Sequence, residues 1–183
     1  MEALQQDQHS NLVVECRNGN RKAQYELYRL YSKGMYNVAM RILANEDEAA
    51  DVLQESFLDA FLRIADFRNE STFGWWIKQI IVNKSISYLR KRRVELVSLD
   101  DEKVESLADD DAYNNDEIQY RVEQVKKAIL LLPGNYRIVL SLFLLEGYDH
   151  EEIAHILKIS ENSSRTQLLR AKRKLIQILK DKD

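Results

Sequence analysis

The chain has 183 residues and a formal net charge of −3, with 45% hydrophobic and 31% charged residues. These proportions are typical of globular proteins, and the length allows one medium domain or two small ones. The sequence also excludes a membrane protein, because no apolar run approaches the length of a membrane span. The N-terminus is polar and acidic and lacks the basic-then-apolar order of a secretory signal. The single cysteine, Cys16, excludes an internal disulfide and fits a reducing cytoplasm; we expect it to be a buried small residue rather than a nucleophile.

Charge is distributed very unevenly along the chain. Residues 94–118 contain ten acids and one base, which leaves +6 on the rest of the chain. Residues 78–93 carry six bases and no acid, and residues 158–182 carry eight bases against two acids. Two basic segments on either side of an acidic connector indicate nucleic-acid binding, which the overall charge hides.

The first half of the chain predicts four successive amphipathic helices. The first follows Ser10, and Asn20 and Asn45 are suited to cap the second and the third. The fourth follows a polar break at residues 67–71 and ends in the four consecutive bases of residues 90–93. Apolar residues recur at helical spacing in each segment, and no strand-like alternation competes with them.

The second half predicts a linker and further helices. Residues 94–116 combine low hydrophobicity with closely spaced like charges, which is typical of a flexible, acidic linker. A helix beyond it is stopped by Pro133, and a very apolar one spans residues 135–146. We therefore predict an all-α protein, in which two small helical domains, residues 1–93 and 117–183, are joined by this linker.

Residues 150–175 are typical of a helix-turn-helix with a basic second helix. Ile153 marks the inner face of the first helix, and Ser160 is suited to cap the second. The second helix buries Leu168 and Ala171 and turns basic and amide side chains outward, as a helix that enters the major groove does. The alternative is an ordinary helical hairpin with a solvated charged face.

Residues 67–93 combine polar side chains, paired tryptophans and a rising density of positive charge. Bases of an unpaired strand stack on aromatic rings while Lys and Arg follow its backbone, and a polar loop ahead of a helix can hold an extruded base. The alternative is that Trp75 and Trp76 belong to the core. At least one is expected to do so, because adjacent helical residues point about 100° apart.

An acidic-amide stripe is predicted on the third helix, formed by Asp51, Gln54, Glu55 and Asp59 at helical spacing. Paired carboxylates can hold a metal or act as an acid–base pair, but there is no nearby histidine and no second carboxylate helix. We therefore expect no metal here. The stripe is either a solvated face or a face that docks another protein.

In this order, the motifs resemble the extracytoplasmic-function (ECF) sigma factors, the small two-domain members of the sigma-70 family, over roughly residues 10–180. Residues 46–64 (EDEAADVLQESFLDAFLRI) are similar to the family's helix that docks on the polymerase β′ clamp. Residues 67–93 (FRNESTFGWWIKQIIVNKSISYLRKRR) resemble the segment that melts the promoter −10 element and holds the non-template strand. Residues 132–175 (LPGNYRIVLSLFLLEGYDHEEIAHILKISENSSRTQLLRAKRKL) resemble the domain that reads the −35 element.

The resemblance implies roles for the matching positions. The residues implied to dock on core polymerase are Asp51, Gln54, Glu55 and Asp59. The residues implied to recognise the −10 element and to bind its single strand are Asn69, Glu70, Ser71, Thr72, Phe73, Trp76, Lys78, Gln79, Asn83, Lys84, Arg90, Lys91, Arg92 and Arg93. The residues implied to read the −35 element are Arg165, Thr166, Leu169, Arg170, Lys172 and Arg173. The last two are implied to lie nearer the phosphates.

The resemblance also implies partners and a place in the cell. Residues 1–93 correspond to sigma region 2 and residues 117–183 to sigma region 4. The implied partners are core RNA polymerase, through its β′ clamp and β flap, promoter DNA and an anti-sigma factor. The implied protein is cytoplasmic, is not inserted in a membrane, and has no catalytic activity, cofactor, metal or small-molecule substrate.

Two other functions fit parts of the chain. One is a transcriptional regulator that binds duplex DNA by itself through residues 150–175, with residues 1–93 as an effector or dimerisation domain. The other is an enzyme. Its candidate groups, Glu46, Glu48, Asp51, His150 and His155, include histidines far in sequence from the acids, which disfavours a shared active site.

Three residues of the helix-turn-helix depart from the family pattern. Lys158 stands where the turn usually has Gly. A lysine in the left-handed backbone conformation costs about 1 kcal/mol, so we expect a differently shaped turn. Asn162 replaces a second common Gly. Ser164 replaces a usual Val, and its hydroxyl is expected to bond back to the helix backbone.

Overall fold

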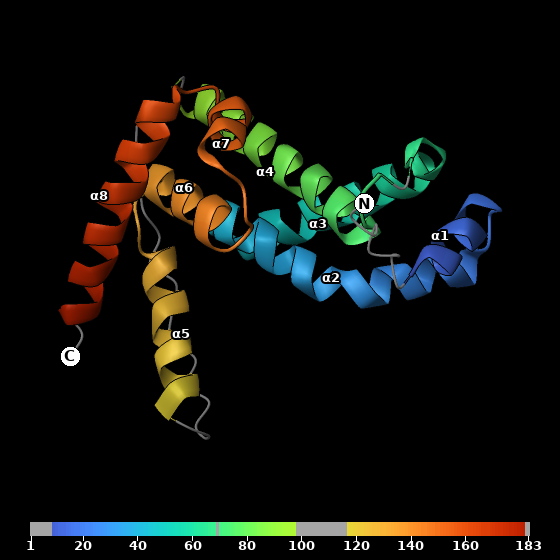
Figure 1. The fold of residues 1–183 in the computed structure, drawn as a ribbon, viewed down its shortest axis with the longest axis horizontal. Coiled ribbons are helices and arrows are strands. Elements are labelled where there is room, and N and C mark those ends of the chain that lie inside the picture. Colours follow the sequence, from blue (N-terminus) through green and yellow to red (C-terminus); the bar gives the residue numbers. More distant parts are fainter. Residues whose placement is uncertain (1–8, 69, 98–116, 182–183) are drawn as a thin grey trace, which may run out of the picture. The chain divides into compact units, whose positions relative to one another are not determined.

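Helices account for all the regular secondary structure of the described residues, 9–68, 70–97 and 117–181, in the computed structural model (Figure 1). This confirms the predicted all-α class for these residues. No helix among them is long and apolar enough to cross a bilayer. The elements are α1 (Ser10–Arg17), α2 (Arg21–Leu43), α3 (Glu46–Leu62), the 3-10 helix η1 (Ile64–Asp66), α4 (Phe73–Val97), α5 (Glu117–Leu130), α6 (Gly134–Leu144), α7 (His150–Leu157) and α8 (Glu161–Lys180).

The chain divides into two compact units, Met1–Ser87 and Tyr88–Asp183. The division falls inside α4, as does the domain boundary predicted at Arg93. α4 also includes residues 94–97, the start of the predicted linker. The rest of that linker lies outside the described residues.

Asparagine caps fix the helix starts of the first unit. The side-chain oxygen of Asn20 accepts the backbone N–H of Lys22 at 2.9 Å, and that of Asn45 accepts the N–H of Glu48 at 3.0 Å. Each cap satisfies an N–H group that the first turn of a helix leaves unpaired. Both predicted caps are confirmed. Ala44, left-handed at φ 53°, turns the chain between α2 and α3.

The core of the first unit lies where α2 packs on α3, with the start of α4 buried as well. Its members recur every three or four residues, which is the spacing that keeps one face of a helix inward. The largest fully buried side chains are Leu27, Ile42, Val52, Phe73, Ile77, Ile81 and Val82. Cys16 is buried too, and burial, followed by the charge of Glu15, raises the pKa of its thiol to about 11. The expected burial of Cys16 is confirmed.

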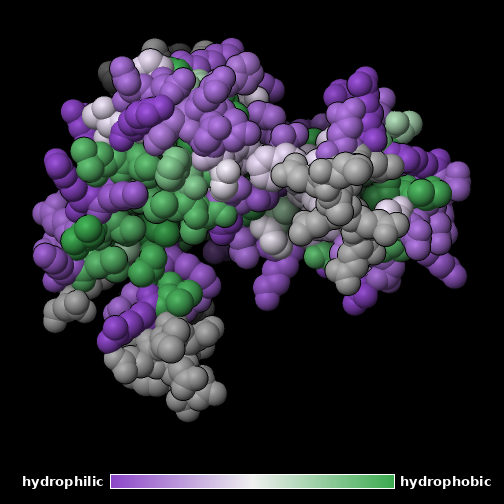
Figure 2. Space-filling view, viewed as in Figure 1, coloured by the Kyte–Doolittle hydropathy of each residue, from purple (hydrophilic) through white to green (hydrophobic). Residues whose placement is uncertain are grey.

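The second unit is built around the apolar helix α6, which packs on α7 and α8. Val139, Leu142 and Ile153 are fully buried there, and Ala171 has no exposed surface. Gly147 makes the turn after α6 possible because its φ of +81° is in the left-handed region. Figure 2 shows hydrophobic side chains gathered over α6 and α8, where large exposed apolar residues include Leu144 of α6 and Leu169 and Ile176 of α8.

Candidate DNA and polymerase interfaces

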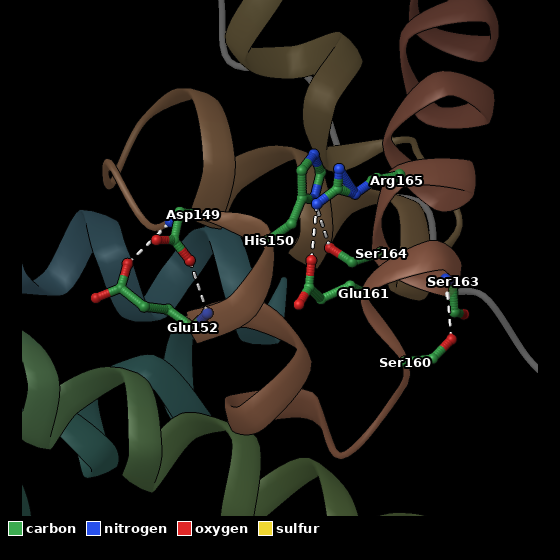
Figure 3. A network of polar contacts seen from close by, with 8 residues as sticks. All are labelled: Asp149, His150, Glu152, Ser160, Glu161, Ser163, Ser164 and Arg165. Atoms are coloured by element: carbon green, nitrogen blue, oxygen red, sulfur yellow. Dashed lines mark hydrogen bonds and ion pairs between the residues drawn. The ribbon is translucent and has the colours of Figure 1, made fainter.

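Reciprocal hydrogen bonds define the start of the helix-turn-helix (Figure 3). The Asp149 carboxylate accepts the backbone N–H of Glu152 at 2.8 Å, and the Glu152 carboxylate accepts the N–H of Asp149 at 2.9 Å. This is a capping box, which pairs two N–H groups that the first turn of α7 leaves free. At the start of α8, the Ser160 hydroxyl accepts the N–H of Ser163 at 3.1 Å, which confirms the predicted cap.

Lys158 closes α7 in the left-handed conformation, at φ 56° and ψ 48°. The expectation of a differently shaped turn was therefore wrong: the lysine adopts the backbone geometry that glycine usually provides. The tight turn places Ser160 at the start of α8 and preserves the order of a helix-turn-helix. Lys158 itself is exposed.

Ser164 is fully buried, and its hydroxyl pairs with His150 rather than with the backbone of its own helix. The distance from His150 Nδ1 to Ser164 Oγ is 2.9 Å, and the imidazole stacks on Phe143 with ring centroids 4.5 Å apart. The expected backbone hydrogen bond is thus replaced by a link between α7 and α8. No local sequence pattern indicates this partner, since the two residues lie on different helices.

The six residues predicted to read the −35 element are exposed on α8. They fall within an arc of roughly 160° on a helix that turns 100° per residue, so they form one face. Leu169 is 52% exposed on this face. Arg165 donates a 2.7 Å ion-pair hydrogen bond to Glu161 one turn earlier. The face offers cationic donors, a hydroxyl and an apolar group.

The start of α4 carries an aromatic cluster below its exposed polar residues. Thr72 caps the helix by accepting the backbone N–H of Trp75 at 3.2 Å. Phe73 is fully buried, whereas Trp75 and Trp76 are both half-buried. Trp76 packs on Phe67 and Phe73, with ring centroids 5.1 Å and 5.8 Å away. The indole of Trp76 is therefore supported from beneath and keeps part of its surface open.

Exposed polar side chains continue along the same face of α4. Gln79 and Asn83 follow Trp76 at i+3 and i+7, and both are exposed. Lys78 lies 5.0 Å from the ring centroid of Trp75, a cation–π distance. The exposed residues of the predicted −10 segment also include Glu70, Ser71, Thr72, Arg90, Lys91 and Arg92. Asn69 and the side chain of Arg93 lie outside what the structure describes.

Arg17 of α1 holds the segment that leads into α4. Its guanidinium donates to the carbonyl of Ile64 at 3.3 Å and to the carbonyl of Phe67, and it lies 5.9 Å from the centroid of the Phe67 ring. Through Phe67 it supports Trp76. Sequence reasoning missed this residue because a single arginine at the end of a short helix carries no motif.

The acidic-amide stripe lies on α3 as predicted, with Asp51, Gln54 and Glu55 exposed and Asp59 half-buried. A cation of α4 joins it: Lys84 Nζ lies 3.1 Å from Glu55 Oε2 and 2.7 Å from Asp59 Oδ2. Burial works to lower the pKa of Lys84, but the hydrogen bonds and charges of Asp59 and Glu55 outweigh it and raise that pKa above its usual value. Lys84 is therefore fully charged at neutral pH.

The described residues contain no group of three or more histidine, cysteine and carboxylate side chains that could hold a metal ion. The candidate enzyme groups fall in different units, with Glu46, Glu48 and Asp51 in the first and His150 and His155 in the second. Burial, followed by the charge of Arg165, lowers the pKa of His150. That histidine serves the packing of the helix-turn-helix.

Known proteins match both units. Residues 27–95 match the family model Sigma-70 region 2, and residues 122–175 match Sigma-70, region 4. The ECF RNA polymerase sigma factor SigM of Bacillus subtilis (strain 168) is 30% identical over 82% of this chain and 91% of its own length. The chain belongs to the ECF sigma factors of the sigma-70 family. It follows that this protein is an RNA polymerase-binding transcription initiation factor that directs promoter recognition.

Other relatives agree with this membership. The RNA polymerase sigma-H factor of Pseudomonas aeruginosa is 29% identical over 92% of each chain. The sigma factor RpoE of Bartonella quintana, solved in complex with the anti-sigma factor NepR, has a TM-score of 0.62 and 25% identity, covering 85% of this chain and 96% of that one. CnrH, solved in complex with the cytosolic domain of CnrY, shares the fold with a TM-score of 0.56 at 22% identity, covering 94% and 97% of the two chains.

Proposed function

We propose that this ECF sigma factor divides promoter recognition between its two units. The stripe of α3 docks on the β′ clamp of core RNA polymerase, and the start of α4 holds the unpaired non-template strand of the −10 element. The outer face of α8 reads the −35 element as a duplex. We retain residues 1–93 and 117–183 as the bounds of sigma regions 2 and 4.

The observation that carries this proposal is the build of the α4 face. An indole that packs on aromatic rings and keeps part of its surface exposed can serve as a stacking platform for a base. The exposed amides of Gln79 and Asn83 then offer donors and acceptors to base edges, and Arg90 to Arg92 offer charge to phosphates. A regulator that binds only duplex DNA has no use for such a platform. Phe73, being buried, acts here by supporting Trp76.

The face of α8 supports duplex binding at the −35 element. Arg165 and Arg170 have the planar donors that recognise guanine in the major groove, and exposed Leu169 suits the methyl group of thymine. Lys172 and Arg173 suit phosphate contacts, which set the register of a helix on DNA. Exposed Leu144 of α6 and Ile176 of α8 support a contact with a second polymerase surface, which we assign to the β flap.

The proposal gives the protein no catalytic activity of its own and no cofactor, since RNA synthesis and the metal ions that it uses belong to the polymerase. It places the protein in the cytoplasm, where polymerase and promoters are. We also propose an anti-sigma factor as a partner, because the Bartonella quintana sigma factor that this chain resembles was solved with one.

In vitro transcription with purified core polymerase tests the proposal, using promoter DNA from upstream of the protein's own operon. We expect the full chain to stimulate transcription from this DNA. Replacing Gln54 and Glu55 together by alanine should weaken core binding and transcription, whereas the matched pair Gln177→Ala with Asp181→Ala, exposed near the end of α8, should change neither. Absence of stimulation on several candidate promoters would overturn the assignment.

Promoter DNA whose −10 region is already unpaired separates capture of the unpaired strand from the other steps of initiation. Trp76→Ala should lower open-complex formation on duplex promoter DNA, because a stacking contact is worth about 1–3 kcal/mol per base. A premelted −10 region removes the cost of unpairing and should restore part of the activity. An equal defect on both templates, with core binding intact, would contradict the role given to α4.

A further inference from the structure

Lys84 links the two surfaces that the proposed function keeps separate. It lies on α4, among the residues expected to contact the −10 strand, yet its ammonium group is directed to the α3 stripe. The side chain is 25% exposed, compared with 65% for Glu55 and 45% for Asp59. The ion pairs are thus partly shielded from water and hold Lys84 against α3.

The stripe needs a cation because its carboxylates are crowded. Asp51, Glu55 and Asp59 follow one another at intervals of four residues, so they share one face of α3. Like charges at this spacing repel each other across one helical turn. Lys84 relieves the repulsion between Glu55 and Asp59 by contacting both of them.

The two carboxylates are not equivalent partners of Lys84. Asp59 is the closer at 2.7 Å and the less exposed, whereas Glu55 is 3.1 Å away and has most of its surface open. Only one Glu55 oxygen, Oε2, contacts the ammonium group. Glu55 can therefore bind a second cation from outside, but it does so with part of its charge already neutralised.

We propose that Lys84 is a positioning residue for polymerase docking: anchored on Asp59, it competes at Glu55 with a basic side chain of the polymerase and so limits the strength of docking. Asp59 then acts through Lys84 and does not touch the polymerase. This inference rests on the proposed docking role of the stripe. It assigns Lys84 to the polymerase interface rather than to the −10 strand.

The sign of the effect separates this role from a merely structural one. Lys84→Met keeps the aliphatic stem and removes the charge, so the exposed Glu55 carboxylate becomes fully available to a basic partner. We expect the Kd of the full chain for core polymerase to fall about two- to fivefold, the size typical of an exposed ion pair. The salt dependence of docking should become steeper. Lys84→Arg, which keeps the charge, should bind like the unchanged protein.

A double-mutant cycle tests the anchoring role of Asp59. In the unchanged background, Asp59→Asn should weaken core binding, because Lys84 then moves onto Glu55 alone. In the Lys84→Met background the same substitution should have no effect. Weakening of equal size in both backgrounds would mean that Asp59 contacts the polymerase directly, which would overturn its assigned role.

The failures of this inference and of the proposed function are distinguishable. If Gln54→Ala with Glu55→Ala leaves core binding intact, the stripe is not the docking face and the proposed function fails. If that pair abolishes binding but Lys84→Met leaves it unchanged or weakens it, only the Lys84 inference fails. A Lys84→Met loss confined to the salt dependence of promoter binding would instead assign Lys84 to DNA phosphates. Thermal unfolding verifies folding, and Lys84→Gln replaces the methionine variant if that variant does not fold.

Discussion

Tyr31 is held from two sides in the first unit. Its hydroxyl lies 2.7 Å from Nδ1 of His9, and its ring packs edge-on against Phe73 with centroids 5.3 Å apart. Gly74, the second residue of α4, lets the helix backbone approach this ring. A Cβ atom built on Gly74 would lie 2.8 Å from Tyr31 Cε1, closer than two carbon atoms can come without movement.

We therefore expect Gly74→Ala to destabilise the protein, by about 1–3 kcal/mol, the usual cost of overpacking a core. The free energy of unfolding from urea denaturation measures it. Gly34→Ala is the matched control, because a Cβ on that helical glycine of α2 meets nothing within 4 Å. The control should stabilise the protein by about 0.5–1 kcal/mol, since alanine favours a helix. A neutral or stabilising Gly74→Ala would mean that the Tyr31 ring moves freely.

His150 should make the stability of the second unit depend on pH. Burial lowers its pKa below the ordinary value of 6.5, Arg165 and Lys172 act in the same direction, and Asp149 and Glu161 oppose them. The unfolded chain therefore takes up the proton first as the pH falls through 6.5, so the folded state loses stability there and the loss levels off below the folded pKa.

The difference in unfolding free energy between the unchanged protein and His150→Gln, measured from pH 7.5 down to pH 5, isolates this contribution. Glutamine can still pair with the Ser164 hydroxyl but does not titrate. His155→Gln, on the exposed side of α7, is the control and should retain the pH dependence. The prediction fails if His150→Gln and the unchanged protein lose stability in parallel.

At the level of helices, local signals were sufficient to predict most boundaries. The caps at Asn20, Asn45 and Ser160 were predictable because a cap is a contact within three residues of sequence. α4 extends beyond the predicted end at Arg93 because the next four residues, Val-Glu-Leu-Val, contain neither glycine nor proline to stop it. Charge density alone does not end a helix.

Contacts between helices could not be predicted in the same way. The partners of Ser164 and Lys84 lie 14 and 29 residues away, on helices whose relative rotation no local pattern determines. The faces themselves were predictable, since helical spacing placed the stripe on α3 and the outward basic residues on α8. The structure was needed to show which residues of those faces already contact side chains of another helix.

The turn of the helix-turn-helix stores conformational strain at Lys158. A residue with a Cβ atom in the left-handed region costs about 1 kcal/mol relative to glycine there. We expect Lys158→Gly to raise the free energy of unfolding of the second unit by about this amount. Lys158→Ala removes the same charge but keeps Cβ, so it should bring little change. Equal effects of the two substitutions would trace the gain to the missing charge and not to the backbone.

At the level of the whole molecule, a protein of net charge −3 must bind DNA through local clusters of charge. Screening limits the reach of exposed charges to about 10 Å at 0.1 M salt, so DNA affinity depends on the charges next to the phosphates and not on the net charge. The bases within residues 158–182, eight against two acids, therefore act as an independent cationic surface.

This surface should divide into phosphate-binding and base-reading residues that respond differently to mutation. Lys172→Ala with Arg173→Ala should weaken promoter binding by the polymerase complex on every −35 sequence and lower the salt slope by about 2, roughly one counterion for each cation removed from a phosphate. Arg165→Ala should instead cost about 1–3 kcal/mol on the preferred −35 sequence and much less on others, because it removes a hydrogen-bond donor to a base. Binding measured from 50 to 200 mM salt on preferred and altered −35 duplexes distinguishes the two. If Arg165→Ala weakened all sequences equally, Arg165 would contact a phosphate, as proposed for Lys172 and Arg173, and base reading would pass to Arg170 and Leu169.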